Sequence, residues 1–256
     1  MCRLVTFRLV LFRLILLALL SAGTFASREA RAGFRVSPVT MTLSASVTSG
    51  LLTITNQSTD AIRFHVTAFV WDEGPDGEML LNPTTDVIFF PAMMSLNANE
   101  ARKLRVGLNV APGGTERSYR LFVQELPPLV QRPEDQPSAV RVLTRMGIPI
   151  FVQGIAPKAA PVVDALAVHG DAATFLIRNT GNAHFLAGKI VVTAKDGPKV
   201  VHTQELQGWY VLAGGTRKYT VTLPQAACQA LKSIQVELET EKGSVQAVLD
   251  SAHCGP

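Results

Sequence analysis

The sequence predicts an all-β protein made of two immunoglobulin-like β-sandwich domains. Short apolar runs alternate with turns rich in Gly, Pro, Asn and Asp along most of the chain, which is the pattern of sandwich strands. Helical periodicity is scarce, and only residues 225–231 have the spacing for a turn of helix. A linker is expected at 153–161, because Pro157 and Pro161 oppose a helix there. We therefore expect one sandwich on each side of this linker.

The first domain is expected at residues 33–153. Residues 62–71 alternate between two faces, with Ile62, Phe64 and Val66 on the more apolar one, as in a half-buried strand. Residues 74–77 (GPDG) form a strong turn signal, and the proline-rich residues 127–138 are expected to be an exposed loop. The expected strands are 51–56, 62–71, 87–90, 101–108, 118–126 and 139–152.

The second domain is expected at residues 158–256. Turn signals at 196–198, 213–215 and 241–243 divide this region into short apolar runs. Its length of about 95 residues is enough for a smaller sandwich. The expected strands are 162–168, 173–179, 188–193, a short one around Val211, 217–223, 234–239 and 245–249.

The N-terminal residues 1–32 have the features of a signal peptide. Arg3, Arg8 and Arg13 form a basic region before the apolar residues 14–22, and residues 30–32 (ARA) offer a cleavage site. The alternative is a membrane anchor, but the apolar run is shorter than the roughly 20 residues that a spanning helix needs. We expect an exported protein without stable membrane insertion.

Cysteine usage agrees with export. Cys228 and Cys254 remain beyond the signal segment, and their spacing fits no zinc pattern. In an oxidising compartment they are expected to form one structural disulfide, and the alternative is two free thiols.

The net charge of +4 comes from the N-terminal segment. Residues 1–32 hold 5 of the 24 basic and 1 of the 20 acidic residues, leaving 19 of each. A balanced chain gives no support to a nucleic-acid partner.

No catalytic constellation is visible in the sequence. The nucleophile-elbow, P-loop, zinc-protease and dinucleotide-binding motifs are all missing from it, and its five histidines are scattered. We therefore expect no enzyme activity, no metal site and no cofactor.

Several segments in order resemble the PapD-like periplasmic chaperones of the chaperone–usher pilus pathway. The resemblance covers the whole first domain and is weaker over residues 158–256. The QELPP ending and the brief acidic loop are most similar to the archaic branch. The segments that carry it are 34–43 (FRVSPVTMTL), which is similar to the family's first strand, 51–57 (LLTITNQ), 69–71 (FVW), 90–106 (FPAMMSLNANEARKLRV), 116–128 (ERSYRLFVQELPP) and the final strand 139–151.

The resemblance implies a periplasmic chaperone whose two sandwiches form an L or boomerang. Such a protein binds and folds pilin or fimbrial subunits by donor-strand complementation and delivers them to an outer-membrane usher. The alternative is an exported, non-catalytic β-sandwich binding or envelope-structural module, which needs no exposed apolar strand.

The last strand of the first domain is the expected donor strand. Apolar side chains recur there at period two, as a strand filling a partner's groove requires. The alternative is that they fill the protein's own core. The candidate donor residues are Val140, Val142, Thr144, Met146 and Ile148.

The resemblance also implies basic residues that anchor the subunit's C-terminal carboxylate. This sequence departs from the family's pattern, because Thr40 and Pro149 stand at the two positions that are usually basic. The remaining candidates are Arg120, Arg145 and Arg105, since arginine suits carboxylate binding. For each of them the alternative is an ordinary solvated arginine.

Overall fold

The computed structural model describes residues 33–74, 76–129 and 142–255. The expected signal peptide and the candidate donor residue Val140 lie outside these ranges. The described chain is almost entirely β-structure with a single short helix, as the sequence predicts. Within the described ranges, no helix has the length and apolar character needed to cross a membrane.

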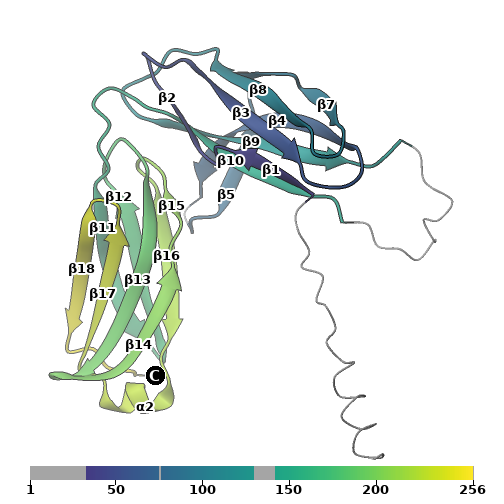
Figure 1. Ribbon diagram of the computed structural model, residues 1–256. Helices are drawn as coiled ribbons and strands as arrows, with labels where there is room; N and C mark the ends of the chain where they lie inside the picture. The colour runs from purple at the N-terminus through teal and green to yellow at the C-terminus, as the bar shows by residue number, and fades with distance from the viewer. Residues whose placement is uncertain (1–32, 75, 130–141, 256) are drawn as a thin grey trace, which may run out of the picture. The chain divides into compact units, whose positions relative to one another are not determined.

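The first sandwich consists of two sheets (Figure 1). One has the order β1 (Phe34–Ser37), β3 (Ser49–Asn56), β8 (Ala101–Leu108) and β6 (Val87–Phe90). The other has the order β2 (Met41–Leu43), β10 (Arg145–Val152), β9 (Arg117–Leu126), β4 (Ile62–Glu73) and β5 (Met79–Pro83), with β7 (Met93–Leu96) also paired to β4.

Alternation places the core between these two sheets. Along β4, Ile62, Phe64, Val66 and Ala68 are buried, whereas the residues between them are partly exposed. The buried side chains contact those of the facing sheet in one continuous cluster. The opposite side of the six-stranded sheet therefore points away from this core and is available for other contacts.

Residues 34–43 form two strands instead of the single expected one. β1 pairs with β3 in the four-stranded sheet, and β2 pairs with β10 in the other. Pro38 lies between them and has no N–H to continue a ladder. The last strand of this sandwich also differs from the expectation, since it begins at Arg145 and residues 142–144 are not strand.

The second sandwich also has two sheets. One has the order β11 (Pro161–His169), β12 (Ala172–Asn179) and β16 (Thr216–Thr222). The other has the order β14 (Lys199–Gln207), β13 (Phe185–Asp196), β17 (Ser233–Thr240) and β18 (Gly243–Asp250), with β15 (Tyr210–Val211) paired to β13.

The helix α2 (Gln225–Ala230) lies where the sequence predicts a turn of helix. Figure 1 shows it beside the C-terminus of the chain. Cys228 follows three residues after its start and forms a disulfide with Cys254, with 5.3 Å between the Cα atoms. The bridge therefore fixes the C-terminal segment to the end of the second sandwich.

Candidate functional site

Strand β10 leaves part of one side unpaired. It pairs with β9 from Arg145 to Val152, but β2 pairs with it only at residues 150–152. The edge of β10 at residues 145–149 therefore has no neighbouring strand in the described part of the chain. Such an edge can accept another strand through backbone hydrogen bonds.

One hydrogen bond sets the direction of the backbone groups along this edge. The amide of Glu125 donates to the carbonyl of Thr144 at 2.9 Å, so Thr144 faces β9. Backbone groups alternate in an antiparallel pair, and Arg145, Gly147 and Pro149 therefore direct theirs to the open side. Pro149 has no N–H, so the edge offers fewer donors there while the ladder with β9 loses none.

The candidate donor residues lie in different environments. Val142 precedes β10 and is 80% exposed, whereas Ile148 is 1% exposed in the core of the first sandwich. Met146 is partly buried and packs against that core, and Thr144 is partly exposed. Ile148 therefore holds β10 in its own sandwich, and Val142 is the described apolar candidate that is free to contact a partner.

Arg120 lies on the outward face of β9, beside the open edge. In the register of the sheet it stands opposite Phe69 of β4 and Pro149 of β10. Its guanidinium carbon lies 3.8 Å from the centroid of the Trp71 ring and 5.8 Å from those of Trp209 and Tyr210. Because the last two residues belong to the second sandwich, both domains enclose this cation.

The guanidinium of Arg120 has unused donor capacity. The residue is only 5% exposed, and its Nε and Nη2 atoms are buried without an acceptor in the described residues. Within the described residues its Nη1 donates to the carbonyl of Gly147 at 3.5 Å. Burial lowers the pKa of Arg120, against a smaller raising effect of Tyr210. A buried cation without a counter-ion is unfavourable, and an incoming carboxylate would relieve this cost.

The other two arginines differ from Arg120. Arg145 is exposed at the start of β10, with its guanidinium carbon 3.7 Å from the centroid of the Phe122 ring. Arg105 lies on β8 in the four-stranded sheet, opposite Leu51 and Phe90. The structure thus brings Arg120 and Arg145 onto one face of one sheet and leaves Arg105 in the other sheet.

Thr40 and Pro149, which replace the expected basic residues, both lie close to this region. Pro149 stands opposite Arg120, and the Thr40 hydroxyl is 3.5 Å from that of Tyr210. Thr40 and Tyr210 line a pocket of about 500 Å³ that also includes Glu116 and His184. A hydroxyl therefore stands at one of the two positions where the family's pattern implies a cation, and a proline stands at the other.

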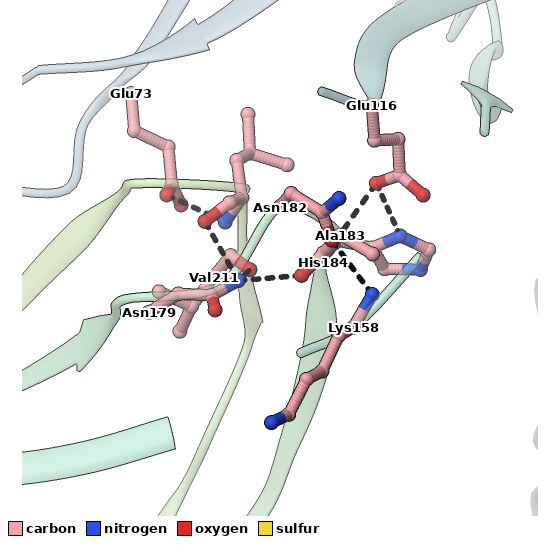
Figure 2. A network of polar contacts seen from close by, with 9 residues as sticks. Glu73, Glu116, Lys158, Asn179, Asn182, Ala183, His184 and Val211 are labelled. Atoms are coloured by element: carbon pink, nitrogen blue, oxygen red, sulfur yellow. Dashed lines mark hydrogen bonds and ion pairs between the residues drawn. The ribbon is translucent and has the colours of Figure 1, made fainter. Parts of the chain in front are cut away.

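Glu116 and His184 join the two sandwiches beside this pocket (Figure 2). The Glu116 Oε1 atom is 2.6 Å from His184 Nδ1 and accepts the His184 backbone N–H at 2.9 Å. The imidazole stacks on Phe151 of β10, with 3.4 Å between the ring centroids. Asn182 adds bonds from its Nδ2 to the carbonyls of Gly114 and Ile155. The end of the open-edged strand is therefore attached to the second domain.

Glu73 makes a second connection between the sandwiches. Its carboxylate accepts the backbone N–H of Leu212 at 2.9 Å and an Arg217 N–H at 3.1 Å. Burial raises the pKa of Glu73, and the bonds to Leu212 and Arg217 oppose this effect. Gly215 leaves room for this carboxylate, because a Cβ there would come within 2.2 Å of a Glu73 oxygen and displace it.

Asn179 organises the loop that carries these contacts (Figure 2). Its buried Nδ2 donates to the carbonyls of Ala183, Val211 and Leu212. Asn56 has the same role in the first sandwich, where its Nδ2 donates to the carbonyl of Leu96. Each asparagine ends a buried strand.

Sequence reasoning missed the aromatic side chains around Arg120. Trp71, Phe151 and Leu212 form a small buried cluster, against which Tyr210 packs. The sequence offers one signal for them: Trp209 and Tyr210 are adjacent in a chain that has only two tryptophans and three tyrosines. In the described part of the chain, no group of three His, Cys, Asp or Glu side chains could hold a metal ion.

A family model describes the first sandwich. Residues 33–158 match the PapD N-terminal domain of pili and flagellar-assembly chaperones. No curated protein sequence is significantly similar to this chain.

Solved structures share the fold. One is from the CsuC–CsuE chaperone–tip adhesion subunit pre-assembly complex of the archaic chaperone–usher Csu pili of Acinetobacter baumannii, with a TM-score of 0.59, 19% identity and coverage of 88% of this chain and 100% of that one. The YadV chaperone matches with a TM-score of 0.58 and 12% identity over 86% of this chain and 100% of its own. The class 5 fimbriae chaperone CfaA matches with a TM-score of 0.53 and 12% identity over 84% of this chain and 98% of its own.

The family match and the shared fold agree with the order of motifs in the sequence. Residues 33–158 therefore form a PapD-type N-terminal domain of the kind found in pili and flagellar-assembly chaperones.

Proposed function

We propose that this protein is a periplasmic chaperone that binds and folds pilus subunits by donor-strand complementation and delivers them to an outer-membrane usher. The observation that carries the proposal is the open edge of β10, which ends beside the Arg120 guanidinium, two of whose nitrogens have no acceptor among the described residues. An edge and a cation at its end suit a partner strand that terminates in a carboxylate.

The direction of that partner strand follows from the position of Arg120. β2 closes the edge of β10 from Ile150 onward, so a strand added at residues 145–149 has to end there. Its C-terminus meets Arg120 only if it runs parallel to β10, as β2 does. We therefore propose Arg120 as the main carboxylate anchor.

The exposed Val142 supports the donor role. A valine that is 80% exposed next to an open edge gains about 1.5–3 kcal/mol when a partner's groove buries it. Met146 would contribute less, because it already packs against the first core. The donor surface we propose therefore centres on the segment before β10.

Export and family type support the remaining parts of the proposal. The basic and apolar residues at the N-terminus support a periplasmic location, and the QELPP ending supports the archaic branch. No ATP-binding motif occurs in the sequence, so we propose that the subunit leaves by strand exchange at the usher.

The test is purification from the periplasm of the native host. Tagged wild type is expected to elute with a small β-rich subunit at one-to-one stoichiometry, and Val142→Glu is expected to lose it. Val200→Glu is the matched control, because Val200 is also exposed but lies on β14 of the second sandwich. Normal capture by folded Val142→Glu would contradict the proposal.

A further inference from the structure

The outward face of the six-stranded sheet is cationic and aromatic near its open edge. Arg120 and Arg145 both lie on it, with Phe122 between them in the register of the sheet and Phe69 opposite Arg120 on β4. No ion pair in the described part of the chain involves either arginine. This face therefore has unbalanced positive charge where a partner strand can be added.

Three residues hold the Arg145 guanidinium in place. The Phe122 ring lies against Gly147 of β10, since a Cβ on Gly147 would come within 2.8 Å of it. Arg145 stacks on that ring at 3.7 Å, and Phe69 packs edge-on against Phe122 at 5.7 Å. Because Gly147 belongs to the edge strand, the ring carries the guanidinium above β10 and next to the open edge.

A strand added at this edge brings its own side chains to the same face. Residues directly opposite each other share a face, with Cβ atoms about 5 Å apart. The partner residues opposite Arg145 and Gly147 therefore lie beside the guanidinium. An acidic side chain there gains a charge-assisted hydrogen bond, whereas a basic one is repelled.

We propose that Arg145 is a specificity-determining residue, which selects partner strands that carry an acidic side chain on this face. The inference rests on the proposed function, since it assumes that a strand is added to β10. It separates the two arginines by role: Arg120 binds the terminal carboxylate, and Arg145 binds a side-chain carboxylate within the strand.

Synthetic peptides test this inference. The probes are fluorescein-labelled ten-residue peptides of alternating Val and Thr, in which one Thr position, scanned along the peptide, is Glu, Gln or Lys. Each is made with a free and with an amidated C-terminus. Fluorescence anisotropy gives the affinities, and the amide signal of Gly147 in ¹⁵N-labelled protein shows whether binding occurs at the edge.

Wild type is expected to bind the best Glu peptide about tenfold more tightly than its Lys counterpart at low salt, as two weak surface charge effects add. The preference is expected to fall in 0.5 M salt. Arg145→Gln is expected to lose the preference for Glu over Lys peptides and to keep the difference in affinity between free and amidated C-termini. Arg120→Met is expected to keep the preference and to lose that difference. Arg105→Gln, on the other sheet, is the matched control and is expected to change neither.

The outcomes separate the two proposals. Binding at the edge with equal affinity for Glu and Lys peptides, or a preference that survives Arg145→Gln, overturns the role of Arg145 alone. Loss of the amidation effect in Arg145→Gln also overturns it, because Arg145 would then bind the terminus. Absence of binding by every peptide contradicts strand addition to β10 and therefore the proposed function as well.

Discussion

Replacing Arg120 with methionine is expected to stabilise the free protein and to abolish subunit capture. Two buried guanidinium nitrogens have no acceptor in the part of the chain that the structure describes, and leaving a buried donor unpaired costs about 1–3 kcal/mol each. The cation–π contact with Trp71 offsets about 1 kcal/mol of this cost. Methionine keeps the linear apolar part of the side chain. The net gain in unfolding free energy is therefore about 1 kcal/mol or more.

Urea unfolding followed by tryptophan fluorescence measures this gain, since both tryptophans of the chain contact Arg120. Arg145→Met is the matched control, and it is expected not to gain stability because Arg145 is exposed. Subunit capture is measured in parallel by purification from the periplasm. If Arg120→Met lowered the unfolding free energy and still captured subunit normally, the guanidinium would be a structural element of the sheet and the reasoning would be refuted.

Three further predictions concern the second sandwich and its attachment. Replacing both Cys228 and Cys254, which are 26 positions apart, with serine is expected to cost about 3.5 kcal/mol of unfolding free energy in urea; an unchanged midpoint would contradict this. Burial raises the pKa of Glu73, so its contribution to stability is present at low pH and lost as the pH rises through the folded-state pKa. The unfolding free energy of Glu73→Gln is therefore expected to equal or exceed that of wild type at pH 7, and any excess is expected to vanish below about pH 4. A lower unfolding free energy of the variant at pH 7 would contradict the raised pKa. Asn179→Ala removes the buried amide that donates to Ala183, Val211 and Leu212 and is expected to lower the unfolding free energy by about 3 kcal/mol, measured by thermal unfolding. Asn179→Asp is expected to lower it at least as much, because a carboxylate cannot donate to these carbonyls and adds a buried charge.

Alternation in the sequence predicted most of the strands, because burial of one face imposes a period of two. It missed β7, which buries Met94 and Leu96 but has only four residues, and it missed two strands without a buried residue. β14, which was not expected, lies at the edge of its sheet and carries no fully buried residue. β5 is likewise an edge strand with mostly exposed side chains. Such strands are set by the neighbour to which they bond, and this information is not local in the sequence.

The candidate site shows the same limit. The period-two pattern at the end of the first domain is equally typical of donor and core residues, and the structure separates Val142 from Ile148 by exposure. Arg120 could be predicted as a candidate carboxylate anchor, because it lies in segment 116–128, which resembles the family. Its enclosure by Trp209 and Tyr210 could not, because these residues come from the other sandwich, about 90 positions along the chain.

The open edge of β10 also has to avoid pairing with a second copy of itself. Exposed edges invite such pairing, and proteins limit it with proline and charged residues. Pro149 removes one donor from this edge, and the side chain of Arg120 already binds the carbonyl of Gly147. Antiparallel pairing of two copies would place Arg120 and Arg145 of both on one continuous face, where like charges oppose association. A partner strand with carboxylates meets the same groups as favourable contacts, so the residues that would select the partner also oppose self-association.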